Sequence, residues 1–179
     1  MDLIDRLLGA ILAATTLDES LVAFLRATAL SQWIVETPWA WPVCEALHFV
    51  GLSLLIGMIA PLDIRLMGFM KGVPIAALRR LVPWAIAGFL INLVTGLLFF
   101  VGAPSQYIAN SSWWLKVLFL LVAGVNILVF ETIKGSRIPE IGLGAGTPAA
   151  LKTIGAVSLV SWFMVLYWGR MLAFLGNAF

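Results

Sequence analysis

Four long runs of apolar residues dominate the pattern of hydrophobic and polar positions along the chain. They cover residues 42–60, 81–101, 113–133 and 150–174. A helix needs about 20 predominantly apolar residues to cross the hydrocarbon core of a bilayer, and each run is close to that length. The pattern predicts an all-α integral membrane protein in which residues 41–179 form a four-helix bundle.

Residues 1–40 follow a different pattern, in which apolar residues recur at helical spacing beside charged ones. Residues 3–12 form one such segment. Thr16 and Glu19 have the spacing of a capping box, which predicts a second helix that runs to about Val35. Its expected apolar face comprises Leu21, Phe24, Leu25 and Thr28. Both segments are amphipathic, so residues 1–40 are expected to form one or two interfacial helices at the membrane surface or on the bundle.

Composition supports a membrane protein and excludes a soluble enzyme. The chain is 62% hydrophobic and 11% charged, whereas ordinary soluble domains are about 45–50% apolar and about 25% charged. The formal net charge is +2 and no basic block is present, so nucleic acid is not an expected partner. No hydrolytic triad is indicated, and we expect a protein that is not an enzyme by itself.

Basic residues in the short loops predict the orientation of the bundle. They are concentrated after the first and third spans, at Arg65, Lys71, Arg79, Arg80, Lys134, Arg137 and Lys152, and the loop over residues 102–112 has none. Loops rich in lysine and arginine usually face the cytoplasm. Both chain termini are therefore expected on the outer side of the membrane.

His48 is the one histidine of the chain and lies inside the first predicted span. Glu45 lies three residues earlier and so shares a face with it on a helix. On the predicted topology Lys116 and Arg170 fall in the same outer half of the bundle, with Tyr167 one turn from Arg170. Ionisable groups inside a membrane are costly and usually face a partner or cofactor, so this group is the candidate site.

A b-type haem is the first ligand that these residues suggest. An axial ligand is commonly a histidine, and Gly51, one turn from His48, is expected to leave room for a flat macrocycle. Lys116 and Arg170 would pair with the propionates. The second axial position is left open, or is filled by Met164, by Met171 or by another subunit. Phe49, Trp162, Phe163, Tyr167 and Trp168 are available to line the pocket.

Two other interpretations remain. Cys44 and His48 are spaced i, i+4, so both would reach one copper or zinc ion, with further ligands from methionines or a partner. Alternatively, Glu45 pairs with Lys116 or Arg170 and the group only holds helices together.

The remaining polar positions in the spans have structural interpretations. Gly88, Asn92 and Gly96 are spaced by four and form a small-residue seam with an interhelical amide. Asn126 and Glu131 lie toward the cytoplasmic end of the third span. Asp63 and Arg65 flank the inner end of the first span and are expected to lock the loop that follows.

Several of these residues carry a family resemblance over about residues 40–175. Glu45-x-x-His48-x-x-Gly51, the segment 62–68 (Leu-Asp-Ile-Arg-Leu-Met-Gly), Trp114-x-Lys116 with Asn126, and Ser161-Trp162 through Trp168-Gly169-Arg170 resemble a family of small uncharacterised bacterial inner-membrane proteins. The His-x-x-Gly helix is more distantly similar to copper-resistance D-type membrane domains, whose extra histidines and methionines are missing here. The resemblance implies a bacterial inner-membrane bundle in which Glu45, His48, Lys116, Asn126 and Arg170 matter, and names no reaction.

Together these observations predict a haem-binding protein in electron transfer or redox sensing. The alternatives are a non-catalytic accessory subunit of a membrane complex, with the N-terminal arm as its docking element, and a carrier of copper or a small solute. The expected partners are the lipid bilayer and either further copies of the chain or the subunits of a complex.

Overall fold

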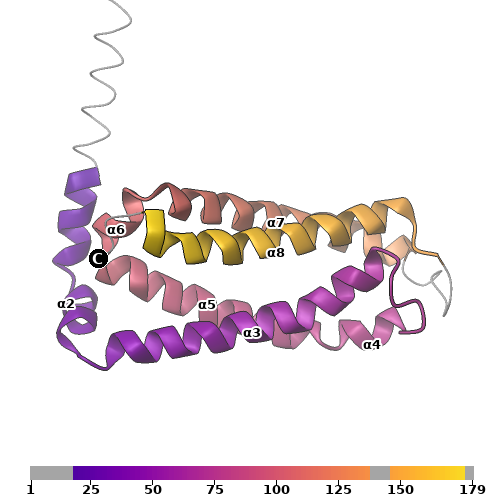
Figure 1. The fold of residues 1–179 in the computed structure, drawn as a ribbon, viewed down its shortest axis with the longest axis horizontal. Helices are drawn as coiled ribbons and strands as arrows, with labels where there is room; N and C mark the ends of the chain where they lie inside the picture. The colour runs from indigo at the N-terminus through magenta and orange to yellow at the C-terminus, as the bar shows by residue number, and fades with distance from the viewer. Residues whose placement is uncertain (1–17, 138–145, 176–179) are drawn as a thin grey trace, which may run out of the picture.

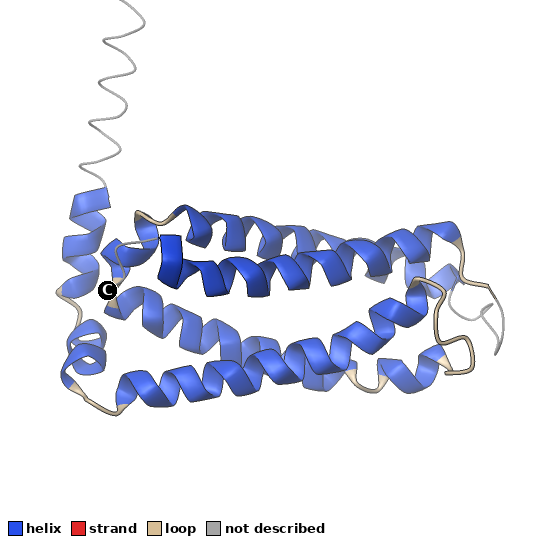
Figure 2. Ribbon diagram, viewed as in Figure 1, coloured by secondary structure: helices blue, strands red, loops and turns tan. Residues whose placement is uncertain are grey.

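Four long helices carry the four apolar runs. The computed structural model describes residues 18–137 and 146–175, and within these ranges the chain is helical without any strand (Figure 2). The long helices are α3 (Ala40–Leu66), α5 (Val82–Gly102), α7 (Ser111–Arg137) and α8 (Ala149–Leu175). Each run is long and apolar enough to cross a membrane. The predicted all-α, four-helix membrane bundle is therefore confirmed.

The helices are arranged as two pairs. α3 packs most extensively against α5 and α7 against α8, and α3 also contacts α8. Short helices lie at the two ends of the bundle (Figure 1): α2 (Ala29–Glu36) and α6 (Pro104–Ile108) at one end, and α4 (Ile75–Arg79) at the other. We call these the α2 end and the α4 end. Residues 103–110, α2 and the last turn of α8 all lie at the α2 end.

The first spanning helix is longer than the sequence predicted. Its apolar run was expected to end at Ala60, before Pro61, but α3 continues through the proline to Leu66. The last turn includes Asp63 and Arg65, which are only 3% and 1% exposed. Both side chains have hydrogen-bond partners inside the fold. Asp63 is bonded to the Ser158 hydroxyl, and Arg65 donates to the Val73 carbonyl oxygen, so the helix can continue.

Glycines set two close helix crossings. A Cβ added to Gly88 of α5 would lie 2.6 Å from the carbonyl oxygen of Gly51 on α3. A Cβ added to Gly155 of α8 would lie 2.6 Å from the carbonyl oxygen of Asp63 on α3. Real Cβ atoms do not approach so closely, so glycine is required for the backbones to meet at both points.

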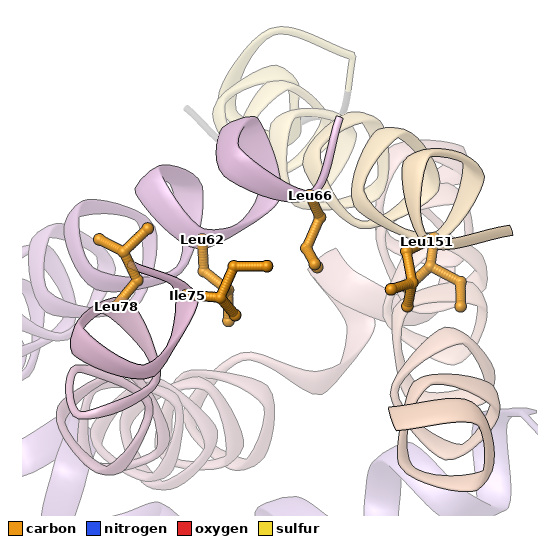
Figure 3. Packing of buried hydrophobic residues seen from close by; sticks show 6 residues of the cluster. Leu62, Leu66, Ile75, Leu78 and Leu151 are labelled. Carbon is orange, nitrogen blue, oxygen red and sulfur yellow. The ribbon is translucent and has the colours of Figure 1, made fainter. Parts of the chain in front are cut away.

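Two apolar clusters fill the interior. Near the middle of the bundle, buried residues from all four long helices meet, namely Leu55, Ala85, Ala123, Trp162 and Val165. Closer to the α4 end a second cluster joins α3, α4 and α8 (Figure 3); its buried members are Leu62, Leu66, Ile75, Leu78, Leu151 and Ile154. α4 is thus packed onto the bundle.

The N-terminal arm is packed onto the bundle, and its helix is divided. Residues 18–26 are helical, residues 27–28 break the helix, and the Thr28 side chain caps the start of α2 by accepting from the Ser31 N–H. The prediction of one helix to Val35, with Thr28 on its apolar face, is wrong, because threonine caps a helix better than it continues one. Ser31 donates to the Val101 carbonyl oxygen of α5 at 2.9 Å. Residues 3–12 and Thr16 lie outside the described residues.

Candidate functional site around His48

His48 is half-buried on α3 and bonded to α5. Its Nδ1 lies 2.7 Å from Oγ1 of Thr95. That hydroxyl donates its single proton to the Ile91 carbonyl oxygen at 2.8 Å, so it is left to accept from the imidazole. With the hydroxyl proton directed to the Ile91 carbonyl oxygen, a neutral imidazole would carry its proton on Nδ1 and keep a free lone pair on Nε2. A histidine in this state, with one nitrogen anchored, is the form that ligates metals or accepts protons.

α5 also supplies the surroundings of the imidazole. The ring of Phe99 lies 5.6 Å from that of His48, and the indole of Trp41 lies 5.0 Å from Phe99. A Cβ added to Gly96 would meet only the His48 Cε1 atom within 4 Å, at 3.8 Å. The imidazole is thus hydrogen-bonded by Thr95, lies beside the ring of Phe99 and has no side chain next to it at Gly96.

Lys116 of α7 brings a positive charge to the same region. Its side chain lies across Gly169 of α8, with Nζ 3.5 Å from the position that a Cβ there would occupy. It is close enough to His48 for its charge to act on the imidazole. Among the described residues Lys116 has no hydrogen bond or ion pair. An ammonium without an anion in this setting favours a negatively charged ligand.

Glu45 belongs to the α2 end. Its side chain is exposed, and it forms no ion pair with Lys116 or Arg170 within the described part of the chain, so the predicted ion pair is absent there. Its charge acts instead on Tyr107 of α6. Burial, and then the charge of Glu45, raise the pKa of Tyr107 to about 12.

The Arg170 guanidinium is exposed and lies over the ring of Phe174, 5.2 Å from its centroid. Tyr167, one turn away, is also exposed, and its ring lies 5.1 Å from that of Trp168. The structure therefore brings His48 and Lys116 together, and places Arg170 and Tyr167 on the outer surface of α8. Their predicted roles at a cofactor stay predictions.

The space expected beside Gly51 is filled. A Cβ added there would lie 2.7 Å from Nδ2 of Asn92 and 2.8 Å from the carbonyl oxygen of Gly88. The prediction that Gly51 leaves room for a macrocycle is wrong, because the glycine serves helix packing. The Asn92 amide, expected to join helices, donates within α5 to the Gly88 carbonyl oxygen at 3.0 Å.

Three of the aromatic residues proposed as a lining, Phe49, Trp162 and Phe163, have other positions. Phe49 and Phe163 are 65% and 64% exposed, on the outside of the bundle. Trp162 is part of the central apolar cluster and packs against Phe89. The ring that contacts the imidazole is Phe99, which sequence reasoning missed.

Thr95 was also missed, although a signal was present. Positions 88, 92, 95, 96 and 99 lie on one side of a helix at three- and four-residue spacing. Once Gly88 and Asn92 are assigned to a seam facing α3, Thr95 and Phe99 belong to the same seam. A hydroxyl at that position is the natural partner of a histidine on the neighbouring helix.

The copper interpretation gains no further ligand. Cys44 is buried, and no group of three or more histidine, cysteine, aspartate or glutamate side chains that could hold a metal ion occurs in the described ranges. Cys44 and His48 remain a pair of candidate ligands on one helix.

Comparison with protein-family models, curated proteins and solved structures finds no match to this chain. The resemblance over residues 40–175 accordingly stays a prediction.

Proposed function

We propose that the chain is a membrane-embedded b-type haem protein in which His48 is an axial ligand through Nε2. The observation that carries the proposal is the chain of hydrogen bonds from His48 through Thr95 to the Ile91 carbonyl oxygen. It fixes the tautomer and orients the ring, as outer-shell partners of ligating histidines do.

The residues around His48 fit such a group in their chemistry. Gly96 offers a side without a side chain, and Phe99 offers an aromatic wall. Lys116 supplies a cation without an anionic partner among the described residues, which suits one propionate. Arg170 is exposed and better suited to a second propionate near the surface or to a lipid headgroup. The second axial position is left to solvent, Met164, Met171 or another copy of the chain.

When bound, the haem would supply one-electron exchange, and the chain would then serve electron transfer or redox sensing. The residues of the chain hold and orient the ligand, while the apolar cluster around Leu55 and Trp162 excludes water from the side facing the α4 end. The excess of basic residues at the α4 end supports a cytoplasmic position for it. The site would lie toward the outer face of a bacterial inner membrane.

The first test is an absorption spectrum of the purified protein, oxidised and then reduced, with a pyridine haemochrome assay. The expected result is a Soret band that His48→Ala abolishes. Thr95→Val, which removes the partner of Nδ1, should weaken haem binding about 10- to 100-fold, and Thr95→Ser should keep it. Cys44→Ala, on the same helix, is the matched control and should keep the full spectrum.

A flat visible spectrum in protein from haem-replete cells would refute the haem proposal. The second candidate is then an accessory subunit, favoured by the fact that the His48–Thr95 bond itself joins α3 to α5. Under that function His48→Ala lowers stability and a partner co-purifies in mild detergent. Bound copper that is lost in Cys44→Ala and His48→Ala would instead support the carrier hypothesis.

A further inference from the structure

A surface cavity of about 500 Å³, largely open to its surroundings, lies at the α2 end between the helical residues 18–26 and α6. This volume is within the range of about 300–1,000 Å³ that small-molecule sites occupy. No function considered above uses it. It is lined by residues from two segments far apart in the sequence, so its shape depends on how the N-terminal arm docks on the bundle.

One helix face forms the first wall. Glu19, Val22, Ala23 and Arg26 line the cavity, and their spacing places them on one side of the helix. Ser105, Ile108 and Ala109 form the opposite wall. Arg26 donates from Nη2 to the Ser105 hydroxyl at 2.7 Å, which ties the two walls together.

The cavity carries charges of both signs, separated along the helix. Asp18 and Glu19 lie at one end, and Arg26 lies about 10 Å further along the axis from Glu19 at 1.5 Å per residue. The lining between them is apolar. A carboxylate accepts well from an ammonium group, and a guanidinium donates well to a phosphate or carboxylate. The arrangement therefore matches a ligand that carries both an ammonium and an oxyanion.

The position of the cavity indicates where such a ligand comes from. α6 lies between the ends of the spanning helices α5 and α7 (Figure 1). A bilayer that these helices span would place its lipid headgroups at that level. On the opposite side of the same helix, Leu21 and Phe24 are 45% and 68% exposed. A helix with a charged face and an apolar face opposite to it is amphipathic, as are helices that lie in the membrane interface.

We propose that this cavity binds the zwitterionic headgroup of an aminophospholipid, with its ammonium toward Asp18 and Glu19 and its phosphate toward Arg26. Binding would fix the N-terminal arm against α6 at the membrane surface. This inference does not depend on the haem proposal, since none of the cavity-lining residues is among those assigned to the site around His48.

The test uses the full chain in nanodiscs of phosphatidylethanolamine or of phosphatidylglycerol, which lacks the ammonium. Lipid retained after transfer to detergent is counted by native mass spectrometry. The wild type is expected to retain phosphatidylethanolamine preferentially. Arg26→Gln and the double variant Asp18→Asn/Glu19→Gln should each lower that retention about tenfold, the effect of losing one charge-assisted contact of about 1.4 kcal/mol. Arg79→Gln, an exposed change at the α4 end, is the matched control.

Equal retention of the two lipids, or unchanged retention in both cavity variants, would overturn the proposal. A second experiment measures the thermal unfolding of the same proteins in the presence of two soluble compounds, phosphoethanolamine and glycine. Stabilisation by a soluble zwitterion that depends on Arg26, without lipid retention, would overturn the lipid assignment and give the site to a free zwitterion. Unfolding curves recorded without ligand serve to check that each variant is folded.

Discussion

Gly51 and Gly88 face each other across the crossing of α3 and α5, and a Cβ on either would come within 2.8 Å of the other's carbonyl oxygen. The contact lies one turn from His48 along α3 and two turns from Thr95 along α5. It therefore fixes the register that brings the imidazole to the threonine hydroxyl. The candidate site depends on a packing contact that involves none of its own polar groups.

Substituting alanine at Gly51 should separate the helices. Because backbone atoms are the obstacle, we expect Gly51→Ala to lower the free energy of unfolding by about 1–3 kcal/mol, the usual cost of overpacking. Gly57, on the same helix, has no atom within 4 Å of an added Cβ. Gly57→Ala is thus the control and should be close to neutral. Denaturation in detergent micelles compares the two, and equal effects would contradict the crossing.

The tautomer of His48 is directly measurable, because it is the one histidine of the chain. We expect nitrogen NMR of protein labelled at histidine to show a protonated Nδ1 and a bare Nε2 in the protein without cofactor. Thr95→Ser should keep that tautomer, and Thr95→Val should shift the population toward protonated Nε2. A wild-type spectrum with the proton on Nε2 would remove the basis of the ligand assignment.

The raised pKa of Tyr107 leads us to expect a loss of stability at high pH. Its pKa is raised to about 12, first by burial and then by the charge of Glu45, whereas a tyrosine in an unfolded chain titrates near pH 10. Between these values the folded chain holds a proton that the unfolded chain has released. The free energy of unfolding should therefore fall as the pH rises from about 10 to about 12.

Three substitutions isolate the contribution of Tyr107. The chain has two tyrosines, so ultraviolet titration of Tyr167→Phe follows Tyr107 alone. Glu45→Gln in that background should lower the midpoint, since it removes a negative charge beside the phenol. Tyr107→Phe should flatten the fall in stability over the same pH range. A midpoint near 10 in the folded protein would disprove the burial of this phenol.

The hydrogen bonds of Arg65 are expected to hold the loop at the α4 end in place. Its side chain donates from Nε to the Val73 carbonyl oxygen at 2.9 Å and from Nη1 to the Thr147 hydroxyl at 3.3 Å. Arg65→Met leaves the Val73 carbonyl oxygen without that donor and should cost about 1–3 kcal/mol.

The loop released by Arg65→Met contains Lys71, so trypsin should cleave there faster than in the wild type. Arg79→Met, at an exposed position of α4, should leave the rate unchanged. An unchanged cleavage rate in Arg65→Met would argue against the anchor. Cleavage in sealed inverted vesicles but not in intact cells would also place the α4 end in the cytoplasm.

The four spans were predictable because apolar length alone specifies a membrane helix, whatever its neighbours. The exact ends were not. The apolar run ends at Ala60, but α3 continues, because Asp63 finds a partner in Ser158, far away in the sequence, and Arg65 finds one in the Val73 carbonyl oxygen of the following loop. The break at Thr28 was missed because the apolar spacing on its two sides is continuous.

The candidate site was only partly predictable, because helix faces follow from sequence and helix register does not. His48 and Lys116 were identified as ionisable residues in the outer half of the predicted bundle, and in the structure they lie close to each other. The space at Gly51 depends on which residue of α5 meets it, and that residue is Asn92. Arg170 was expected to pair with a propionate, yet its guanidinium is exposed and lies over the ring of Phe174, one turn further along α8.

Each spanning helix packs most extensively against its neighbour in the chain, α3 with α5 and α7 with α8. The molecule is thus two consecutive helical hairpins joined through α6. The first hairpin can form its Gly51–Gly88 contact before the second has been synthesised, which keeps most contacts local in sequence. A chain divided within α6 would keep both hairpins whole. The hydrogen bonds of Asp63 with Ser158 and of Arg65 with Thr147 would then help two separate fragments to reassemble.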